Sequence, residues 1–225
     1  MHEEAPAARR HRLLEQRCLL LCVALIALLV AIPMLRDTLP GRTLLAFFHV
    51  AILLAAVAAV GRTRRSLLIA GMLLLPAFVL RLGVVVSGAP ELLAANWVFS
   101  AIFYLFVVAN LLWYVFLPQV ISQDKLFGAV AAYIMIAIFW SYLHALAQYF
   151  YPDSYAFQGV PQPLQTEELI YFSFTVLTTS GFGDIAPANI QARYLTILEM
   201  LVGVMFVAIL IARLIGVYPG KVEKS

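Results

Sequence analysis

The sequence predicts an all-α membrane protein with six transmembrane helices and one irregular segment between the fifth and sixth. Of its 225 residues, 64% are hydrophobic and 12% are charged, whereas a soluble domain is about 45–50% apolar and 25% charged. A polar, glycine-rich stretch at 178–184 lies between two long apolar runs. Irregular backbone at membrane depth is tolerated only where protein buries it or where it lines a watery path. The chain is therefore expected to form a pathway for a polar solute.

Six apolar runs approach or exceed the length of about 20 residues that crosses a bilayer. Arginine in short loops sets their orientation. The arginines of the N-terminal tail and the cluster Arg62, Arg64 and Arg65 place both termini in the cytoplasm. The chain then divides into a tail at 1–16, a four-helix domain at 17–117 and a C-terminal domain at 118–225. The spans are Arg17–Leu35, Leu44–Val60, Ser66–Val86, Ala95–Leu117, Leu126–Phe150 and Arg193–Tyr218.

The first four spans lack the charge pattern of a voltage sensor. The fourth span contains no arginine or lysine, although a sensor needs several charges that move across the membrane potential. Cys18 and Cys22 lie in the first span and are expected to be inert buried thiols. This domain is interpreted as a scaffold, a lipid contact or an arm that packs on a neighbour.

A short helix is predicted at 167–178, after a loop rich in proline. Thr166 is the expected N-cap, and Glu167 and Glu168 supply acids in the first turn. The helix is too short to span a bilayer, so it is expected to enter and return. Its C-terminus would then direct partial negative charge towards a cation.

The stretch after this helix alternates glycine with other residues. Gly181 and Gly183 can both take positive φ without a Cβ penalty, so successive carbonyls can point the same way. A ring of such strands would form stacked oxygen cages that replace the water shell of a cation.

The same stretch resembles the selectivity filter of potassium channels, Thr-Val-Gly-Tyr-Gly-Asp. Thr179, Gly181, Gly183 and Asp184 match that pattern, while Ser180 replaces Val and Phe182 replaces Tyr. The resemblance extends over residues 126–217. It implies an outer helix at 126–150, a re-entrant pore helix at 167–178, a selectivity filter at 179–184 and an inner helix at 193–218.

The resemblance also implies a role for each matching position. Four copies in a homotetramer would coordinate K⁺ through the backbone carbonyls of Thr179, Ser180, Gly181 and Phe182, with Gly183 completing the filter. Gly203 would be a gating hinge, or alternatively a site of close packing against the fifth helix. The filter would be supported by Thr178, Asp184, Glu199, Tyr171 and Phe172, and the cavity lined by Val204, Val207, Ile211 and Ile215.

Glu199 is an ionisable residue inside the sixth span and is therefore a functional candidate. It is expected to face the pore helix and accept a hydrogen bond from Ser173, Thr175 or Thr178. The alternative is that Glu199 lines the cavity and concentrates cations. No sequence feature connects it with His144. Arg213, near the end of the same span, is expected to extend to the membrane interface.

Three functions remain open at this point. The first is a potassium-selective channel in the plasma membrane, the second a poorly selective monovalent cation channel, and the third a non-conducting scaffold or regulatory subunit. The sequence offers no motif for an enzyme, for nucleic-acid binding or for a cofactor other than permeant K⁺. Membrane lipids and further copies of the chain are the expected partners. Filter, lipid, tension, pH or a partner protein could each supply the gating stimulus.

Overall fold

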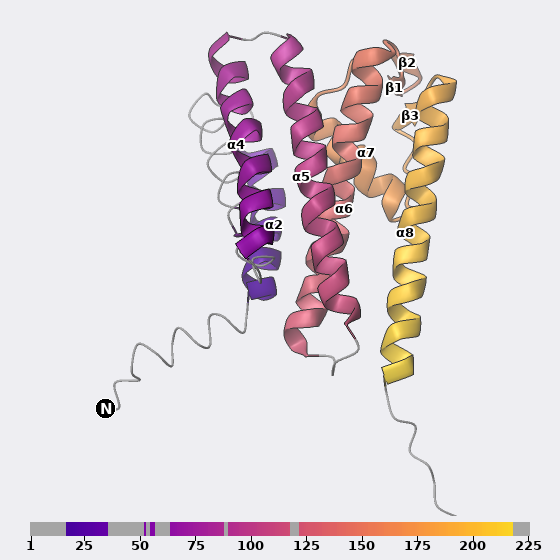
Figure 1. The fold of residues 1–225 in the computed structure, drawn as a ribbon. Helices are drawn as coiled ribbons and strands as arrows, with labels where there is room; N and C mark the ends of the chain where they lie inside the picture. The colour runs from indigo at the N-terminus through magenta and orange to yellow at the C-terminus, as the bar shows by residue number, and fades with distance from the viewer. Residues whose placement is uncertain are drawn as a thin grey trace, which may run out of the picture.

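The computed structural model describes residues 17–35, 52, 55–56, 64–87, 90–117 and 122–217. Within these ranges the chain forms long helices and one short helix, joined near one end by a small sheet (Figure 1). The helices are α2 (Arg17–Leu35), α4 (Arg64–Ser87), α5 (Pro90–Phe116), α6 (Gln123–Phe150), α7 (Thr166–Leu177) and α8 (Ile190–Val217). The strands are β1 (Tyr155–Phe157), β2 (Val160–Pro161) and β3 (Ile185–Pro187).

Four of the described helices are long and apolar enough to cross a membrane, namely α2, α5, α6 and α8. The first predicted span has the bounds of α2. The third, fourth, fifth and sixth correspond to α4, α5, α6 and α8, with ends that differ by at most five residues. The apolar part of α4 is shorter, at Leu68–Val84. The second predicted span, Leu44–Val60, lies outside the described residues except for three isolated positions. The number of six spans therefore stays a prediction.

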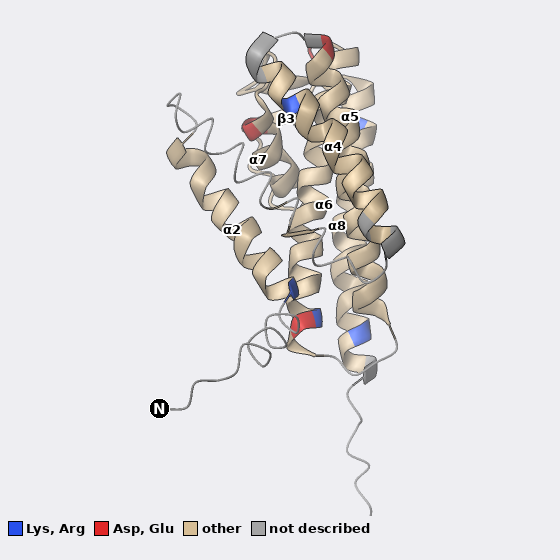
Figure 2. Ribbon diagram, turned by 60° about the vertical axis from the view of Figure 1, so that its left-hand side comes forward, with Lys and Arg blue, Asp and Glu red and all other residues tan. Residues whose placement is uncertain are grey.

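Helix α6 is the centre of the bundle. It contacts α2, α5, α7 and α8, and α4 packs on the far side of α5. The short helix α7 runs obliquely between α6 and α8 (Figure 1). Charged residues of the described helices lie mainly towards the helix ends (Figure 2), as expected for helices whose middle parts contact hydrocarbon.

The predicted all-α class is confirmed for the described residues, with the addition of a small three-stranded antiparallel sheet that was not predicted. Its order is β2-β1-β3, with Ala156 opposite both Pro161 and Ala186. The sheet joins the hairpin that follows α6 to the segment that leaves the glycine-rich stretch. The strands were missed because each has only two or three residues, too few for a visible alternation of apolar and polar side chains.

The start of α7 lies one residue earlier than predicted. Gln165, and not Thr166, is the N-cap, and its backbone N–H donates to Glu168 Oε2 at 2.7 Å. A capping box of this kind satisfies amide donors that the first turn leaves unpaired. The loop before α7 is tied to α6 because Gln148 exchanges two hydrogen bonds with the backbone of Leu164. Both ends of this loop are thus fixed.

Polar contacts join four helices at the end of the bundle where α5 ends and α6 begins. The Asp124 carboxylate accepts from the Cys18 amide at 2.9 Å and from the Tyr114 hydroxyl at 3.1 Å. Arg213 of α8 donates to the carbonyl of Leu117 at 2.9 Å and to that of Phe116 at 3.4 Å. Whether Arg213 also lies at the membrane interface stays a prediction. Carbonyls at a helix C-terminus carry partial negative charge and attract a cation, so Arg213 holds α8 against α5.

Gly203 lies where α8 crosses the end of α7. A Cβ atom at this position would lie 2.2 Å from the carbonyl oxygen of Leu177, the last residue of α7. Gly203 therefore packs closely against α7, the predicted pore helix. The alternative prediction placed this close contact on the fifth span, which is α6. Small residues allow such approaches between membrane helices. Whether Gly203 is also a hinge stays a prediction.

We expect Gly203→Ala to destabilise the protein by about 1–3 kcal/mol, the usual range for overpacking. The added methyl group must displace the Leu177 carbonyl, which is backbone and cannot rotate away. Thermal unfolding in lipid nanodiscs measures the effect. The control is Gly71→Ala in α4, where an added Cβ meets nothing within 4 Å and alanine favours the helix by about 1 kcal/mol. Equal melting temperatures for the two variants would contradict the packing argument.

A second expectation concerns the contact between α8 and α5. Arg213→Gln should lower the unfolding free energy by about 1.5–3 kcal/mol, the range for hydrogen bonds that involve a charged group. Arg193→Gln serves as the control, because Arg193 is exposed and makes one long hydrogen bond, 3.4 Å to the Pro187 carbonyl. The same thermal measurement compares them. If Arg213→Gln lowers the stability no more than Arg193→Gln does, the contact of Arg213 with α5 does not hold α8 in place.

Candidate functional site

The segment after α7 has an alternating backbone. Thr179 has φ 58°, Gly181 has φ 52° and Gly183 has φ 80°, so every second residue is in the left-handed region. Glycine adopts this region freely, whereas a residue such as Thr179 does so at an energetic cost that the surroundings must offset. The alternation is the geometry that lets successive carbonyls point to the same side of a strand.

The amide groups at the start of this segment turn back towards α7. Thr179 donates to the Val176 carbonyl at 2.9 Å, and Ser180 and Gly181 donate to the Thr175 carbonyl at 2.9 and 3.2 Å. The backbone hydrogen bonds of the described residues leave the carbonyls of 179–182 without an amide donor. These residues are exposed in the single chain. A carbonyl without a donor needs another partner, and a cation is one such partner.

The hydroxyls behind the segment form a short chain. Thr178 Oγ1 donates to the Phe174 carbonyl at 2.7 Å, and the hydroxyls of Thr178 and Ser180 lie 2.9 Å apart. Ser180 thus makes a polar contact where potassium channels, by the resemblance, have an apolar side chain. Thr178 thus contacts the glycine-rich segment through Ser180. Whether it supports a selectivity filter there stays a prediction.

The far end of the segment is fixed to the sheet. The carbonyl of Asp184 accepts from the amide of Gln158 at 2.7 Å, and Ile185 follows directly in β3. The rings of Tyr171 and Phe182 are stacked with centroids 6.4 Å apart. Desolvation, and then the neighbouring Asp184 carboxylate, raises the pKa of Tyr171. Tyr171 therefore joins α7 to the end of the glycine-rich segment.

Phe172 faces the opposite way from Tyr171. It is buried and packs edge-on against His144, with ring centroids 5.1 Å apart, and against Tyr155 at 5.4 Å. Tyr155 in turn contacts His144 at 5.5 Å. The predicted pair of aromatic residues is thus divided, one on the side of the glycine-rich segment and one inside the chain.

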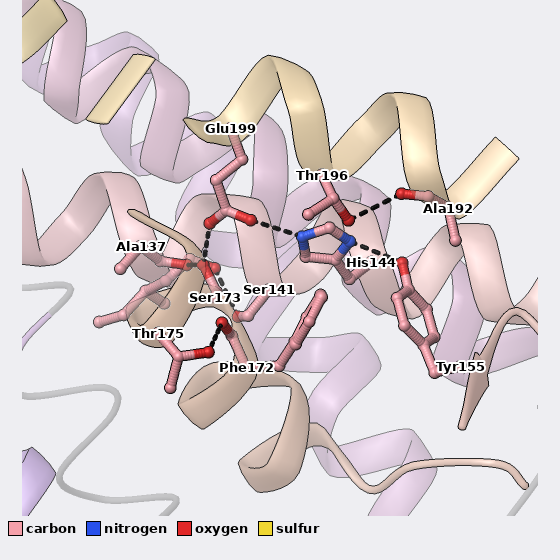
Figure 3. Close-up of polar contacts among 11 residues, drawn as sticks. Ala137, Ser141, His144, Tyr155, Phe172, Ser173, Thr175, Ala192, Thr196 and Glu199 are labelled. Atoms are coloured by element: carbon pink, nitrogen blue, oxygen red, sulfur yellow. Dashed lines mark hydrogen bonds and ion pairs between the residues drawn. The ribbon is translucent and has the colours of Figure 1, made fainter. Parts of the chain in front are cut away.

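Glu199 lies at the centre of a buried polar network (Figure 3). Its Oε2 is 2.6 Å from His144 Nε2, and its Oε1 contacts Ser173 Oγ. His144 Nδ1 is 2.6 Å from the Tyr155 hydroxyl, and Ser173 Oγ is 2.6 Å from the carbonyl of Ala137. All four side chains are fully buried. The network joins α6, α7, α8 and β1.

The network confirms one expectation for Glu199 and corrects others. Ser173 is the predicted contact on α7, whereas Thr175 and Thr178 donate to carbonyls of their own helix. The alternative in which Glu199 lines the cavity does not fit its burial within the chain. His144, which sequence reasoning left unconnected, is its direct partner. The residues are 55 positions apart, and the available signal was that both are ionisable groups in apolar spans.

The predicted cavity residues lie on an exposed part of α8. Val204, Val207, Ile211 and Ile215 are 43–69% exposed in the single chain. Many other apolar residues of α8 are also exposed. The row therefore is not covered by the described parts of the same chain, and its role as a cavity lining stays a prediction.

Comparisons with known proteins found a similarity in the C-terminal part of the chain. Residues 126–218 match a family described as ion channels. No curated protein and no solved structure matches the chain. The matched region contains α6 from Leu126 onward, α7, the glycine-rich segment and α8. This part of the chain is therefore similar to ion channels, and the described residues include four helices long and apolar enough to cross a membrane.

Proposed function

We propose that the protein is a potassium channel that conducts K⁺ passively across the plasma membrane, with both termini in the cytoplasm. The observation that carries the proposal is the set of carbonyls at 179–182, which lack an amide donor and belong to a backbone of alternating handedness. Oxygens arranged in this way replace the hydration shell of an ion without a charged side chain. K⁺ is the only ligand required, and no enzymatic step is involved.

The proposed filter needs several copies of the chain, because one copy supplies one strand of carbonyls. The exposed apolar surface of α8 supports such an assembly. Of the spanning part of α8, 17% is buried, compared with 67% for α6. Cyclic symmetry is the usual arrangement of homo-oligomers, and four copies around one axis would form a filter of the kind that the sequence resembles. Membrane lipids would cover what the neighbouring copies leave exposed.

The helix α7 favours a cation at this place. Its C-terminus lies next to the glycine-rich segment, and the aligned peptide dipoles give that end partial negative charge. Its acids, Glu167 and Glu168, lie at the opposite end. With four such helices, their negative ends would converge below the filter, where the apolar row from Val204 to Ile215 would line the cavity and close it by dewetting.

One observation favours a second candidate, a monovalent cation channel with poor selectivity. The hydroxyls of Ser180 and Thr178 contact each other behind the proposed filter, and a hydroxyl pair packs less firmly than apolar side chains. A filter that adjusts its diameter would discriminate less between K⁺ and Na⁺. This candidate differs from the first only in selectivity.

We expect purified protein in liposomes to carry a K⁺ flux, and Gly181→Ala to reduce that flux to the level of protein-free vesicles. Alanine resists positive φ by about 1–2 kcal/mol per residue, and four copies would bring four methyl groups to one axis. Gly159→Ala is the matched control, since Gly159 also has positive φ, 81°, but lies in the hairpin between β1 and β2. Equal flux in the two variants would refute the proposed pathway, and no flux with unmodified protein would favour a non-conducting subunit.

Selectivity is tested by the reversal potential in opposed K⁺ and Na⁺ gradients. For a potassium-selective channel we expect a value close to the K⁺ equilibrium potential, and Ser180→Val should leave it there. A poorly selective channel would give a value between the two equilibrium potentials, which Ser180→Val should move towards that of K⁺. The physical reason is that valine removes the hydroxyl contact with Thr178 and packs behind the carbonyls.

A further inference from the structure

The buried network around Glu199 can be assigned hydrogen by hydrogen. It contains four contacts, which join the Ala137 carbonyl, Ser173, Glu199, His144 and Tyr155 in that order. Each contact needs one hydrogen between its two heavy atoms. The possible donors follow from the chemistry of each side chain, so the protonation of the network can be deduced from its geometry.

The assignment begins at the Ala137 carbonyl, which carries no hydrogen. Ser173 has a single hydroxyl hydrogen, and the 2.6 Å contact with Ala137 uses it. Ser173 Oγ lies within donating distance of both the Ala137 carbonyl and Glu199 Oε1, but it has one hydrogen for the two contacts. The contact with Glu199 must then take its hydrogen from Glu199, in place of the expected donation from Ser173. A carboxylate has none, so Glu199 must be protonated on Oε1.

The rest of the chain follows in one direction. With Oε1 protonated, Glu199 Oε2 accepts from His144 Nε2, and the neutral imidazole then accepts on Nδ1 from the Tyr155 hydroxyl. Burial raises the pKa of Tyr155, so its hydroxyl hydrogen is retained. Every hydrogen is used, and every contact is satisfied.

The alternative charge state satisfies fewer contacts. If His144 were protonated and Glu199 ionised, both ring nitrogens would donate. The Tyr155 hydroxyl hydrogen would then have no acceptor within the network, and Ser173 would still have one hydrogen for two contacts. Unpaired buried polar groups are costly, and a buried ion pair regains its desolvation penalty only when its remaining hydrogen bonds are complete.

We infer that Glu199 and His144 form a proton-binding site: Glu199 holds one dissociable proton, and His144 is the positioning residue that fixes the carboxyl group. The proton completes a one-way chain of donors from Tyr155 through His144, Glu199 and Ser173 to the Ala137 carbonyl. Hydrogen bonds aligned in this way polarise and strengthen one another. The chain ties α7 to α6 and α8, and its effect on conduction rests on the proposed function.

Among the described residues, the surroundings of the site contain no second charge that would compensate for the loss of this proton. In these ranges the ion-pair partner of Glu199 is His144. The other titratable groups facing it are Tyr133 from α6 and Tyr155 from β1, and α7 contributes the non-titrating Ser173. When the proton leaves to the solvent as the pH rises, the contact with Ser173 loses its hydrogen and a charge remains buried.

The sign of the pH effect follows. Stability that depends on the bound proton is fully present below the ordinary pKa of an unfolded glutamate, about 4.3. It is lost progressively as the pH rises from there to the pH at which the folded protein releases the proton, and it is constant above that pH. The melting temperature of the unmodified protein in nanodiscs should therefore fall as the pH rises over this interval and then level off. K⁺ flux in liposomes should fall at the upper end of the interval, where folded Glu199 loses its proton.

Glu199→Gln tests the assignment sharply. The glutamine carbonyl can accept from His144, and its amide N–H can donate to Ser173, so the one-way chain is reproduced without a dissociable proton. We expect this variant to melt as the unmodified protein does at acidic pH, where Glu199 is protonated in both the folded and the unfolded chain, and to lose the fall with rising pH. Glu199→Leu removes the chain and should melt at a lower temperature than Glu199→Gln at every pH. A melting temperature of Glu199→Gln well below that of the unmodified protein at acidic pH, or equal stability of the two variants, would overturn the inference.

Infrared spectroscopy detects the proton itself. The difference spectrum between unmodified protein and Glu199→Gln should contain the carbonyl band of a protonated carboxylic acid. The control is Glu167→Gln, at the start of α7. This variant should keep the band in its own spectrum, so that its difference spectrum lacks it. His144→Leu removes the donor to Oε2, so the band should move to higher frequency. Absence of the band overturns the inference. Neither the carbonyl band nor the melting temperature depends on conduction. If both behave as expected but the unmodified protein carries no K⁺ flux, the proposed function is refuted and the proton-binding site is not.

Discussion

The hydrogen bonds from the amides of Thr179, Ser180 and Gly181 to the end of α7 are the interaction on which the candidate site depends. A strand that turns its amides to one side presents its carbonyls to the other. Neighbouring strands of a sheet would normally donate to those carbonyls. Here the amides of the segment donate to carbonyls at the end of α7, and the carbonyls of 179–182 have no amide donor among the described residues. The position of α7 therefore sets the position of the oxygens.

Several independent contacts hold α7 in place. The Tyr133 hydroxyl donates to the Leu177 carbonyl at 3.0 Å, beside the point where Gly203 brings α8 against the same residue. Ser173 joins α7 to the network of Glu199 and His144, and Gln148 fixes the preceding loop. These contacts come from α6 and α8, so α7 is braced along its length and the strain of Thr179 at positive φ is offset by its surroundings.

The sequence predicted the features that depend on local pattern. Apolar runs gave the long helices to within a few residues, and alternate glycines gave the alternating backbone, because both follow from the chemistry of neighbouring residues. Features that depend on distant residues were not accessible. His144 and Glu199 meet only because α6 and α8 cross, Arg213 finds the end of α5 from 96 residues away, and strands of two or three residues carry no periodicity. The fit of Gly203 against Leu177 likewise requires knowledge of where α7 ends.

The difference in burial between α6 and α8 has a consequence for biogenesis. A newly made chain can complete the surroundings of α6 alone, since that helix finds its neighbours among its own segments. The described parts of the same chain leave most of the apolar surface of α8 uncovered. If further copies of the chain cover that surface, as proposed, damage to α6 should appear early, as loss of the individual subunit. Damage to the open surface of α8 should then appear late, as intact subunits that fail to associate.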